Sequence, residues 1–94
     1  MRKLFWGKTF IRAVKQASRR HPDLLEILPT TLQLLSEDPF APPLETHKLK
    51  GKLSGSWACK VRYDLRIIFD FVKTQEQGED HILLLELGSH EEVY

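Results

Sequence analysis

The apolar residues change their spacing along the chain, from a helical period to a strand period, and this change constrains the fold more than any other feature. From Thr9 to Arg20 they recur at helical spacing with basic side chains mostly opposite, which predicts an amphipathic helix. A second stripe of this kind runs from Leu24 to Leu35, and Asp38-Pro39 stops it. From Trp57 to Asp64 the apolar side chains fall on alternate positions instead, as in a half-buried strand.

The remaining segments complete the expected topology. Pro29 lies inside the second helix and should kink it or split it, and the proline-rich residues 39–46 predict an extended or looping connection. A tight turn at 63–65 would pair the first strand with the apolar segment that follows it. Residues 81–90 are nearly continuous in apolar side chains, as expected of a central strand, and residues 1–6 can add an edge strand.

We therefore expect one α+β domain over residues 1–94, with an N-terminal helical hairpin packed on one face of a small, mainly antiparallel β-sheet. Hydrophobic residues make up 41% and charged residues 29% of the chain, as in ordinary soluble proteins. The sequence has neither an apolar run of the roughly 18 residues that a membrane helix needs nor the pattern of a signal peptide. We expect a cytoplasmic protein that does not contact membranes.

The histidines and the single cysteine, Cys59, show none of the spacings that metal ligands adopt, and one cysteine cannot form an internal disulfide. The sequence therefore predicts no metal, no cofactor and no redox role.

Positive and negative charges alternate in blocks, although the net charge is only +1. Residues 1–21 hold seven Lys or Arg and no acid, and residues 22–46 hold five acids and no Lys or Arg. Residues 47–66 hold six basic residues and one acid, and the rest of the chain holds one and seven. Such blocks can create a local positive field that attracts an anionic partner. The alternative is that they solvate exposed faces and form salt bridges between segments.

The third block places its charges around one predicted strand. If Trp57 and Cys59 point into the core beneath the helices, Lys60 and Arg62 point to the other face of the sheet, and Arg66 lies just beyond the turn. His47 and three lysines (Lys48, Lys50, Lys52) come immediately before this strand. A basic surface of this kind suits a phosphate backbone.

Three spaced motifs resemble the RelE and YafQ branch of bacterial type II toxins, within the superfamily that also contains ParE. They are H-x-L-x-G at 47–51, S-W-x-C-x-V-x-Y-D-L-R-I-I-F at 56–69 and G-S-H-x-E-V-Y at 88–94. The resemblance implies a ribosome-dependent endoribonuclease that cleaves mRNA, with the ribosome and mRNA as partners. It also implies a cognate antitoxin and contact with operator DNA through that antitoxin.

The resemblance also implies site residues by position. His47 and His90 match catalytic histidines of YafQ-like members, Asp64 matches their acidic residue in the strand turn, and Arg66 matches the arginine that RelE-like members use against phosphate. Tyr94 stands where the family places an aromatic residue that acts on the RNA near the scissile phosphate.

Further basic residues would hold the RNA. Lys60 and Arg62 match paired basic residues of the family, and we expect Lys48, Lys50 and Lys52 to contact the RNA backbone. The sequence departs from the pattern at Lys60, where YafQ-like toxins have a second histidine. It also ends at Tyr94, without the extra C-terminal helix of some RelE-like members.

Metal-independent RNA cleavage needs a base for the 2′-hydroxyl proton, an acid for the leaving 5′-oxygen and positive charge for the phosphorane. Histidine suits both proton transfers, because both of its protonation states are populated near neutral pH. We assign these transfers to His47 and His90, charge stabilisation to Arg66 and Lys60, and the orientation of one histidine to Asp64. Tyr94 would stack on a base or donate its phenolic proton.

Other interpretations of these residues remain open. His90 could cap the last strand, and His47 could be an exposed loop residue beside lysines. A ParE-like toxin that inhibits gyrase would share the fold but lack the RNase residues. A catalytically inactive remnant that only binds its antitoxin or nucleic acid is a third possibility, which the departure at Lys60 leaves open.

Overall fold

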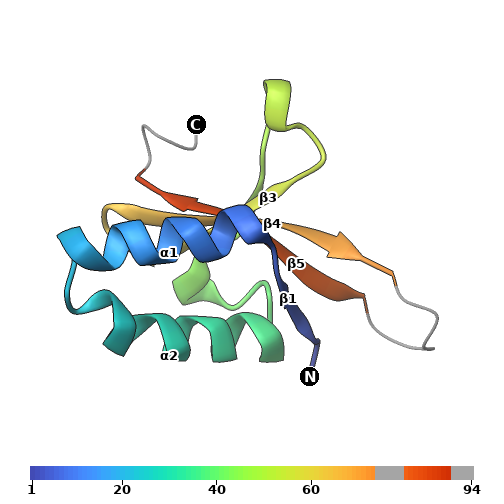
Figure 1. The fold of residues 1–94 in the computed structure, drawn as a ribbon. Coiled ribbons are helices and arrows are strands. Elements are labelled where there is room, and N and C mark those ends of the chain that lie inside the picture. Colours follow the sequence, from blue (N-terminus) through green and yellow to red (C-terminus); the bar gives the residue numbers. More distant parts are fainter. Residues whose placement is uncertain (74–79, 90–94) are drawn as a thin grey trace.

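The computed structural model describes residues 1–73 and 80–89 and folds them into two helices on one face of a five-stranded sheet (Figure 1). The elements follow in the order β1 (Leu4–Trp6), α1 (Lys8–Arg20), α2 (Leu24–Glu37), η1 (Pro42–Leu44), β2 (His47–Lys48), η2 (Gly51–Leu53), β3 (Trp57–Arg62), β4 (Leu65–Val72) and β5 (His81–Gly88). This arrangement confirms the predicted α+β fold. No helix among the described residues has the length and hydropathy to span a bilayer.

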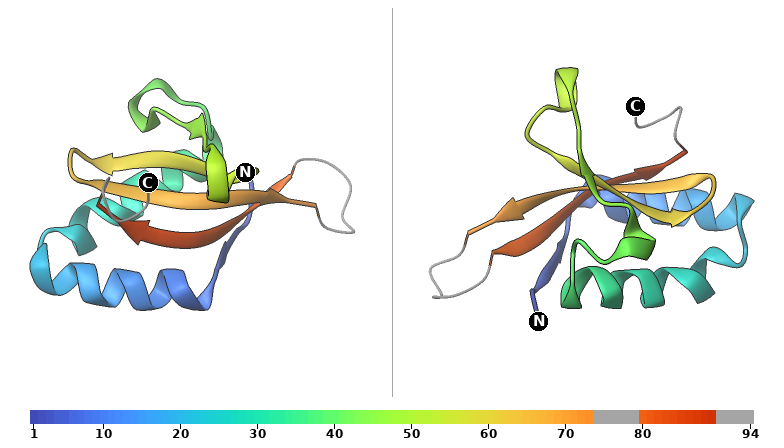
Figure 2. Two further views of the ribbon diagram at one scale, coloured as in Figure 1. Left: turned by 90° about the horizontal axis from the view of Figure 1, so that it is seen from above. Right: turned by 180° about the vertical axis from the view of Figure 1, so that it is seen from behind.

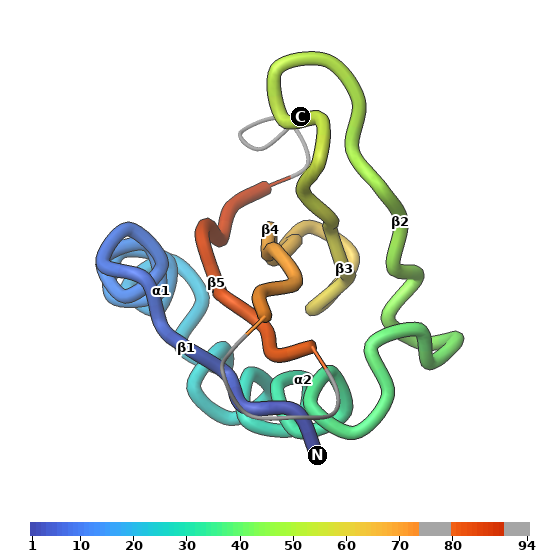
Figure 3. Tube along the Cα trace, turned by 90° about the vertical axis from the view of Figure 1, so that its right-hand side faces the viewer, coloured from blue at the N-terminus to red at the C-terminus, as the bar shows by residue number. Residues whose placement is uncertain are grey.

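The strands lie in the order β1-β5-β4-β3-β2, so β4 is the middle strand (Figure 3). β5 is an interior strand between β1 and β4, which accounts for its nearly continuous apolar sequence. β1 pairs in parallel with β5, and every other pairing is antiparallel. The expected edge strand and the turn between β3 and β4 are therefore both present.

The helices cover one face of the sheet, and the main core lies between them and it (Figure 3). α1 buries Phe10 and Val14, as its helical spacing predicts. On β3, Cys59 lies in this core and Trp57 packs against it. The core contains Phe10, Val14, Leu24, Leu28, Leu32, Leu35, Ala41, Leu44, Cys59, Leu65, Ile67, Phe69, Ile82, Leu84 and Leu87.

The other face of the sheet, called the open face below, carries no α-helix among residues 1–73 and 80–89. A small apolar cluster of Leu49, Ala58 and Ile68 lies there, with Leu85 packed against it. The chain between β2 and β3 projects on this side, away from α1 and α2 (Figure 2). The open face is thus a polar surface around a small apolar centre, and not a uniformly basic surface.

Pro29 does not split the second helix, because α2 continues from Leu24 to Glu37 with the proline inside it. A proline at this position removes the hydrogen bond to the carbonyl of Leu25, one turn earlier. Pro29 and Leu25 are both exposed, so water can hydrate that carbonyl. The connection at 39–46 also contains a short 3₁₀ helix, η1, where the sequence predicted only extended or looping chain.

Gly7 marks a close contact between the start of α1 and the sheet. Its N–H donates to the Leu84 carbonyl oxygen at 2.9 Å, and a Cβ on Gly7 would lie 2.7 Å from that oxygen. Because the Cβ position is fixed by the backbone of Gly7 and the oxygen belongs to the backbone of Leu84, α1 or β5 must shift to relieve this contact.

We predict that Gly7→Ala lowers the free energy of unfolding by about 1–3 kcal/mol, the usual cost of overpacking. Chemical denaturation followed by circular dichroism measures this change. Lys8→Ala, at the exposed next position, is the control and should change stability by less than about 0.5 kcal/mol. Equal stability of Gly7→Ala and the native protein would show that α1 moves away from the sheet at no cost.

Candidate functional site

Strand pairing brings a histidine and two cations onto the open face. Lys60 on β3 pairs with Arg66 on β4, and Arg66 pairs with Gly88 on β5. His47 on β2 pairs with Ala58, a member of the open-face cluster. Because paired residues point to the same side of a sheet and alternate residues of a strand share a face, His47, Lys60 and Arg66 lie on one surface. All three were predicted as site residues, and the fold brings them onto the same face of the sheet.

The predicted motif at the chain end begins at Gly88, which pairs with Arg66. The two site residues of this motif, His90 and Tyr94, lie outside the described residues. Their predicted roles therefore stay predictions.

Glu45 joins this site, although it lies outside the sequence motifs and was not predicted as a site residue. Its carboxylate lies 3.0 Å from the Lys60 ammonium, and its carbonyl oxygen lies 3.0 Å from Nδ1 of His47. Its backbone is left-handed, with φ of 47°, the one positive φ among the described non-glycine residues. The available signal was its position two residues before His47, but the charge pattern grouped Glu45 with the acidic block.

The pKa of Glu45 is lowered from its ordinary value of 4.5, chiefly by the hydrogen bond and charge of Lys60 and further by the charges of Arg66 and His47. A lowered pKa means that the ion pair contributes fully above pH 4.5 and is lost only as the pH falls through the lowered value. Glu45 therefore occupies Lys60 at neutral pH, as a competitor of any phosphate that binds there.

Arg66 is anchored through one nitrogen to the turn between β3 and β4. Its Nη1 donates to the carbonyl oxygens of Arg62 at 2.8 Å, Tyr63 at 3.1 Å and Leu65 at 3.2 Å. Hydrogen bonds from one end of a guanidinium to carbonyl oxygens restrict its direction, because the group is planar. The conformation of the turn therefore determines the position of the Arg66 guanidinium on the open face.

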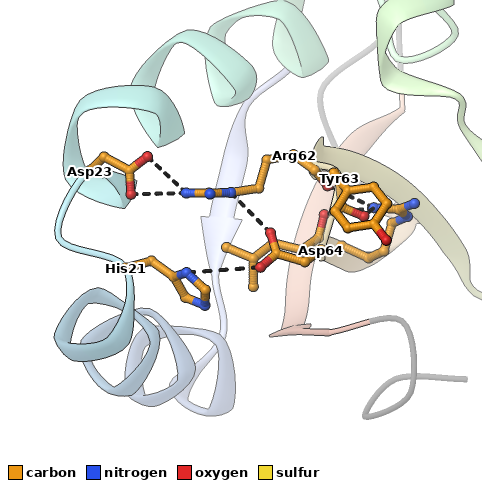
Figure 4. A network of polar contacts seen from close by, with 7 residues as sticks. His21, Asp23, Arg62, Tyr63 and Asp64 are labelled. Atoms are coloured by element: carbon orange, nitrogen blue, oxygen red, sulfur yellow. Dashed lines mark hydrogen bonds and ion pairs between the residues drawn. The ribbon is translucent and has the colours of Figure 1, made fainter.

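Arg62 does not lie on the open face, which corrects its predicted orientation. An irregularity in the β3–β4 pairing falls between Lys60 and Arg62 and breaks the alternation there. Nη1 of Arg62 donates to both carboxylate oxygens of Asp23, at 2.9 and 2.8 Å, at the start of α2 (Figure 4). Arg62 thus joins the sheet to the helical hairpin, and its predicted contact with RNA has no support from this geometry.

Asp64 belongs to the same group of side chains. Its Oδ1 lies 3.0 Å from Nε of Arg62, and its Oδ2 lies 4.0 Å from Nδ1 of His21 (Figure 4). Among the described residues, the histidine beside Asp64 is therefore His21, and not His47, which pairs with the other end of β3. Neither His21 nor Asp23 was assigned a site role from the sequence.

Lys48 does not share the open face with His47, which corrects its predicted place. It pairs with Trp57, on the helix side of β3, and its ammonium lies 6.0 Å from the centre of the Trp57 ring. Lys50 and Lys52 are exposed in the chain between β2 and β3. Their predicted contact with RNA stays a prediction.

Cys59 is fully buried on the helix side of β3, as predicted. Burial raises the pKa of its thiol to about 12, against a partly opposing effect of Arg66, so the thiol stays protonated near neutral pH. A hollow of about 120 Å³ also opens on the helix side, between α1 and β5, and its lining contains none of His47, Lys60 or Arg66. Within residues 1–73 and 80–89, no three His, Cys, Asp or Glu side chains gather to hold a metal ion.

A model of the YafQ bacterial toxins of type II toxin-antitoxin systems matches residues 2–94. The chain belongs to this family. YafQ from E. coli strain BL21(DE3) has the same fold, with a TM-score of 0.77 and 21% identity over 100% of this chain and 99% of that one. This toxin is also similar to a metal-bound toxin from Helicobacter pylori, with 30% identity over 100% of both chains and a TM-score of 0.76.

The E. coli DinJ-YafQ toxin-antitoxin complex provides a third comparison, with a TM-score of 0.73 and 22% identity over 99% of this toxin and 97% of that chain. No curated protein sequence matches the chain. The family match confirms the resemblance stated from the sequence, and this toxin is a type II toxin of the YafQ kind.

We predict that Glu45→Gln raises the affinity of this toxin for RNA, because it removes the carboxylate that pairs with Lys60. The logarithm of the binding constant should also fall more steeply with salt, by about one unit of slope, since one more cation meets a phosphate. Fluorescence anisotropy with a labelled RNA at several salt concentrations measures both quantities. Glu26→Gln, which removes an exposed carboxylate on α2, is the control; equal effects of the two variants would contradict the local competition.

Proposed function

We propose that this toxin is an endoribonuclease that cleaves mRNA on the ribosome by acid–base catalysis without a metal. The observation that carries the proposal is the placement of one imidazole, His47, beside two cations, Lys60 and Arg66, on the face of the sheet opposite α1 and α2. Acid–base cleavage of RNA needs both kinds of group within reach of one phosphate. The RelE and YafQ branch that the sequence resembles supports the same reaction.

In the proposed reaction the 2′-oxygen attacks the adjacent phosphorus and the bond to the 5′-oxygen breaks, which gives a 2′,3′-cyclic phosphate and a 5′-hydroxyl. One group takes the 2′-hydroxyl proton and another protonates the leaving oxygen. When Nδ1 of His47 carries the proton and donates to the Glu45 carbonyl oxygen at 3.0 Å, Nε2 of the neutral ring is unprotonated. His47 is then in the form that a general base requires.

The other roles follow from charge and sequence position. Arg66 and Lys60 would stabilise the negative charge that grows on the phosphorane. The second proton transfer is assigned to His90, and a stacking or proton-donating role to Tyr94. Asp64 was predicted to orient one histidine; because Arg62 and His21 are its partners among the described residues, we do not assign it to His47, and its orientation of His90 stays a prediction.

We also propose that the partner of this toxin is an antitoxin with an acidic, partly disordered segment. Such a segment would neutralise Lys60 and Arg66 and cover the open face. The E. coli relative was solved as a complex with DinJ, which supports a partner of this class. Binding of operator DNA through the antitoxin, and a cytoplasmic location, belong to the same proposal.

The proposal is tested with purified toxin, a defined mRNA and programmed ribosomes, with cuts mapped by primer extension. We predict cleavage that requires ribosomes and survives prior dialysis of the toxin against EDTA. His47→Ala should lower the rate about 10²–10⁴-fold, the usual contribution of a proton-transfer group. Lys15→Ala, an exposed lysine on α1, is the control and should cleave at the native rate.

Four outcomes would contradict parts of the proposal. Loss of cleavage after dialysis, with recovery on adding a metal, would exclude the metal-independent route. Cleavage by His47→Ala at the native rate would remove His47 from the reaction. No cleavage by native toxin, together with growth arrest and inhibited DNA supercoiling, would establish the gyrase-directed alternative, and no growth arrest would establish the inactive remnant.

A further inference from the structure

Asp23 occupies a helix-capping position but does not cap its helix. It is the residue before the first turn of α2, where an aspartate commonly accepts backbone N–H hydrogen bonds, yet its side chain makes no capping bond. Both carboxylate oxygens instead accept from Nη1 of Arg62, thirty-nine residues later in the sequence. The carboxylate therefore binds the end of β3 and does not cap α2.

The same arginine lies beside the turn to which Arg66 is bound. Arg62 is held from one side by Asp23 and from the other by Asp64, whose Oδ1 lies 3.0 Å from its Nε (Figure 4). The carbonyl oxygens of Arg62 and Tyr63 in turn accept from Arg66. A continuous series of polar contacts therefore leads from the start of α2 to a cation on the open face.

We propose that Asp23, acting through Arg62 and the β3–β4 turn, is a positioning residue for Arg66. Asp64 has the same role from inside the turn. The proposal rests on the proposed function, in which Arg66 faces the phosphate, but it makes a separate statement about how that side chain is held. It gives a role to an acidic residue that lies outside every motif of the toxin resemblance.

The exposure of these three side chains argues against a role in folding stability alone. The side chains of Asp23, Arg62 and Asp64 are 57%, 34% and 40% exposed, and ion pairs at such positions add little to folding stability. Misplacing a charged group near a reacting phosphate has a larger effect on rate, because stabilisation of the transition state depends on geometry. Loss of Asp23 should thus affect cleavage more than it affects folding.

A double-mutant cycle tests the coupling between Asp23 and Arg66. We predict that Asp23→Ala lowers the single-turnover cleavage rate about tenfold, in line with a displacement of well under 1 Å, and leaves KM nearly unchanged. In an Arg66→Lys background, which keeps the charge but lacks the planar guanidinium, the same substitution should cost less than about twofold. Glu26→Ala removes another exposed acid near the start of α2 and is the matched control, with the native rate expected.

Equal losses from Asp23→Ala in the two backgrounds would overturn the proposal, because Asp23 would then act independently of Arg66. An unchanged rate would overturn it as well. Should Asp23→Ala fold poorly, Asp23→Asn retains one acceptor oxygen and serves in the same cycle. Asp23→Glu, which retains the charge, should recover part of the rate.

A second measurement separates this proposal from the proposed function. Nuclear magnetic resonance relaxation of the Arg66 Nε–H group reports the order of its side chain without any cleavage. We predict an ordered group in the native toxin and a clearly lower order parameter in Asp23→Ala, with Glu26→Ala like the native protein. An ordered Arg66 in Asp23→Ala would refute positioning by Asp23, whatever the enzymatic activity of this toxin is.

Discussion

The register of β3, β4 and β5 is the constraint on which the rest of the structure depends. It places Cys59, Ile67 and Leu87 toward the helices and sets Lys60, Arg66 and Gly88 in one row across the sheet. A slip by one residue would bury the cations and expose the core, so the free energy of core burial enforces the register. The packing of the two helices thereby also determines which charges meet on the open face.

The charge blocks of the sequence serve the fold. Lys60 and Arg62 of the second basic block pair with Glu45 and Asp23 of the acidic block. Part of the charge pattern is therefore accounted for by salt bridges between segments, the plainer of the two explanations that the sequence left open. The two pairs differ in position, because Lys60–Glu45 lies at the proposed site and Arg62–Asp23 supports it from the helix side.

Local patterns in the sequence predicted the helices and strands of this fold well. They failed where the direction of a side chain depends on pairing with a distant segment. Helical and alternating spacing identified α1, α2 and β3, since burial of one face determines each of them. The same alternation placed Arg62 wrongly, because the irregularity after Lys60 arises from pairing with β4 and has no signal in β3 itself. Lys48 was misplaced because its face follows from its pairing with Trp57, and the continuity of α2 across Pro29 reflects exposure that the sequence does not show.

The proposed function requires that RNA meets this toxin on the open face. The most direct test is a nuclear magnetic resonance titration of the labelled toxin with a short RNA that carries a 2′-deoxy nucleotide at the cleavage position, so that binding occurs without reaction. We predict the largest chemical-shift changes at Lys60, Arg66 and Gly88. Changes confined to the exposed basic residues of α1, such as Arg12 and Arg19, would contradict it and would move the RNA to the helix side of the sheet.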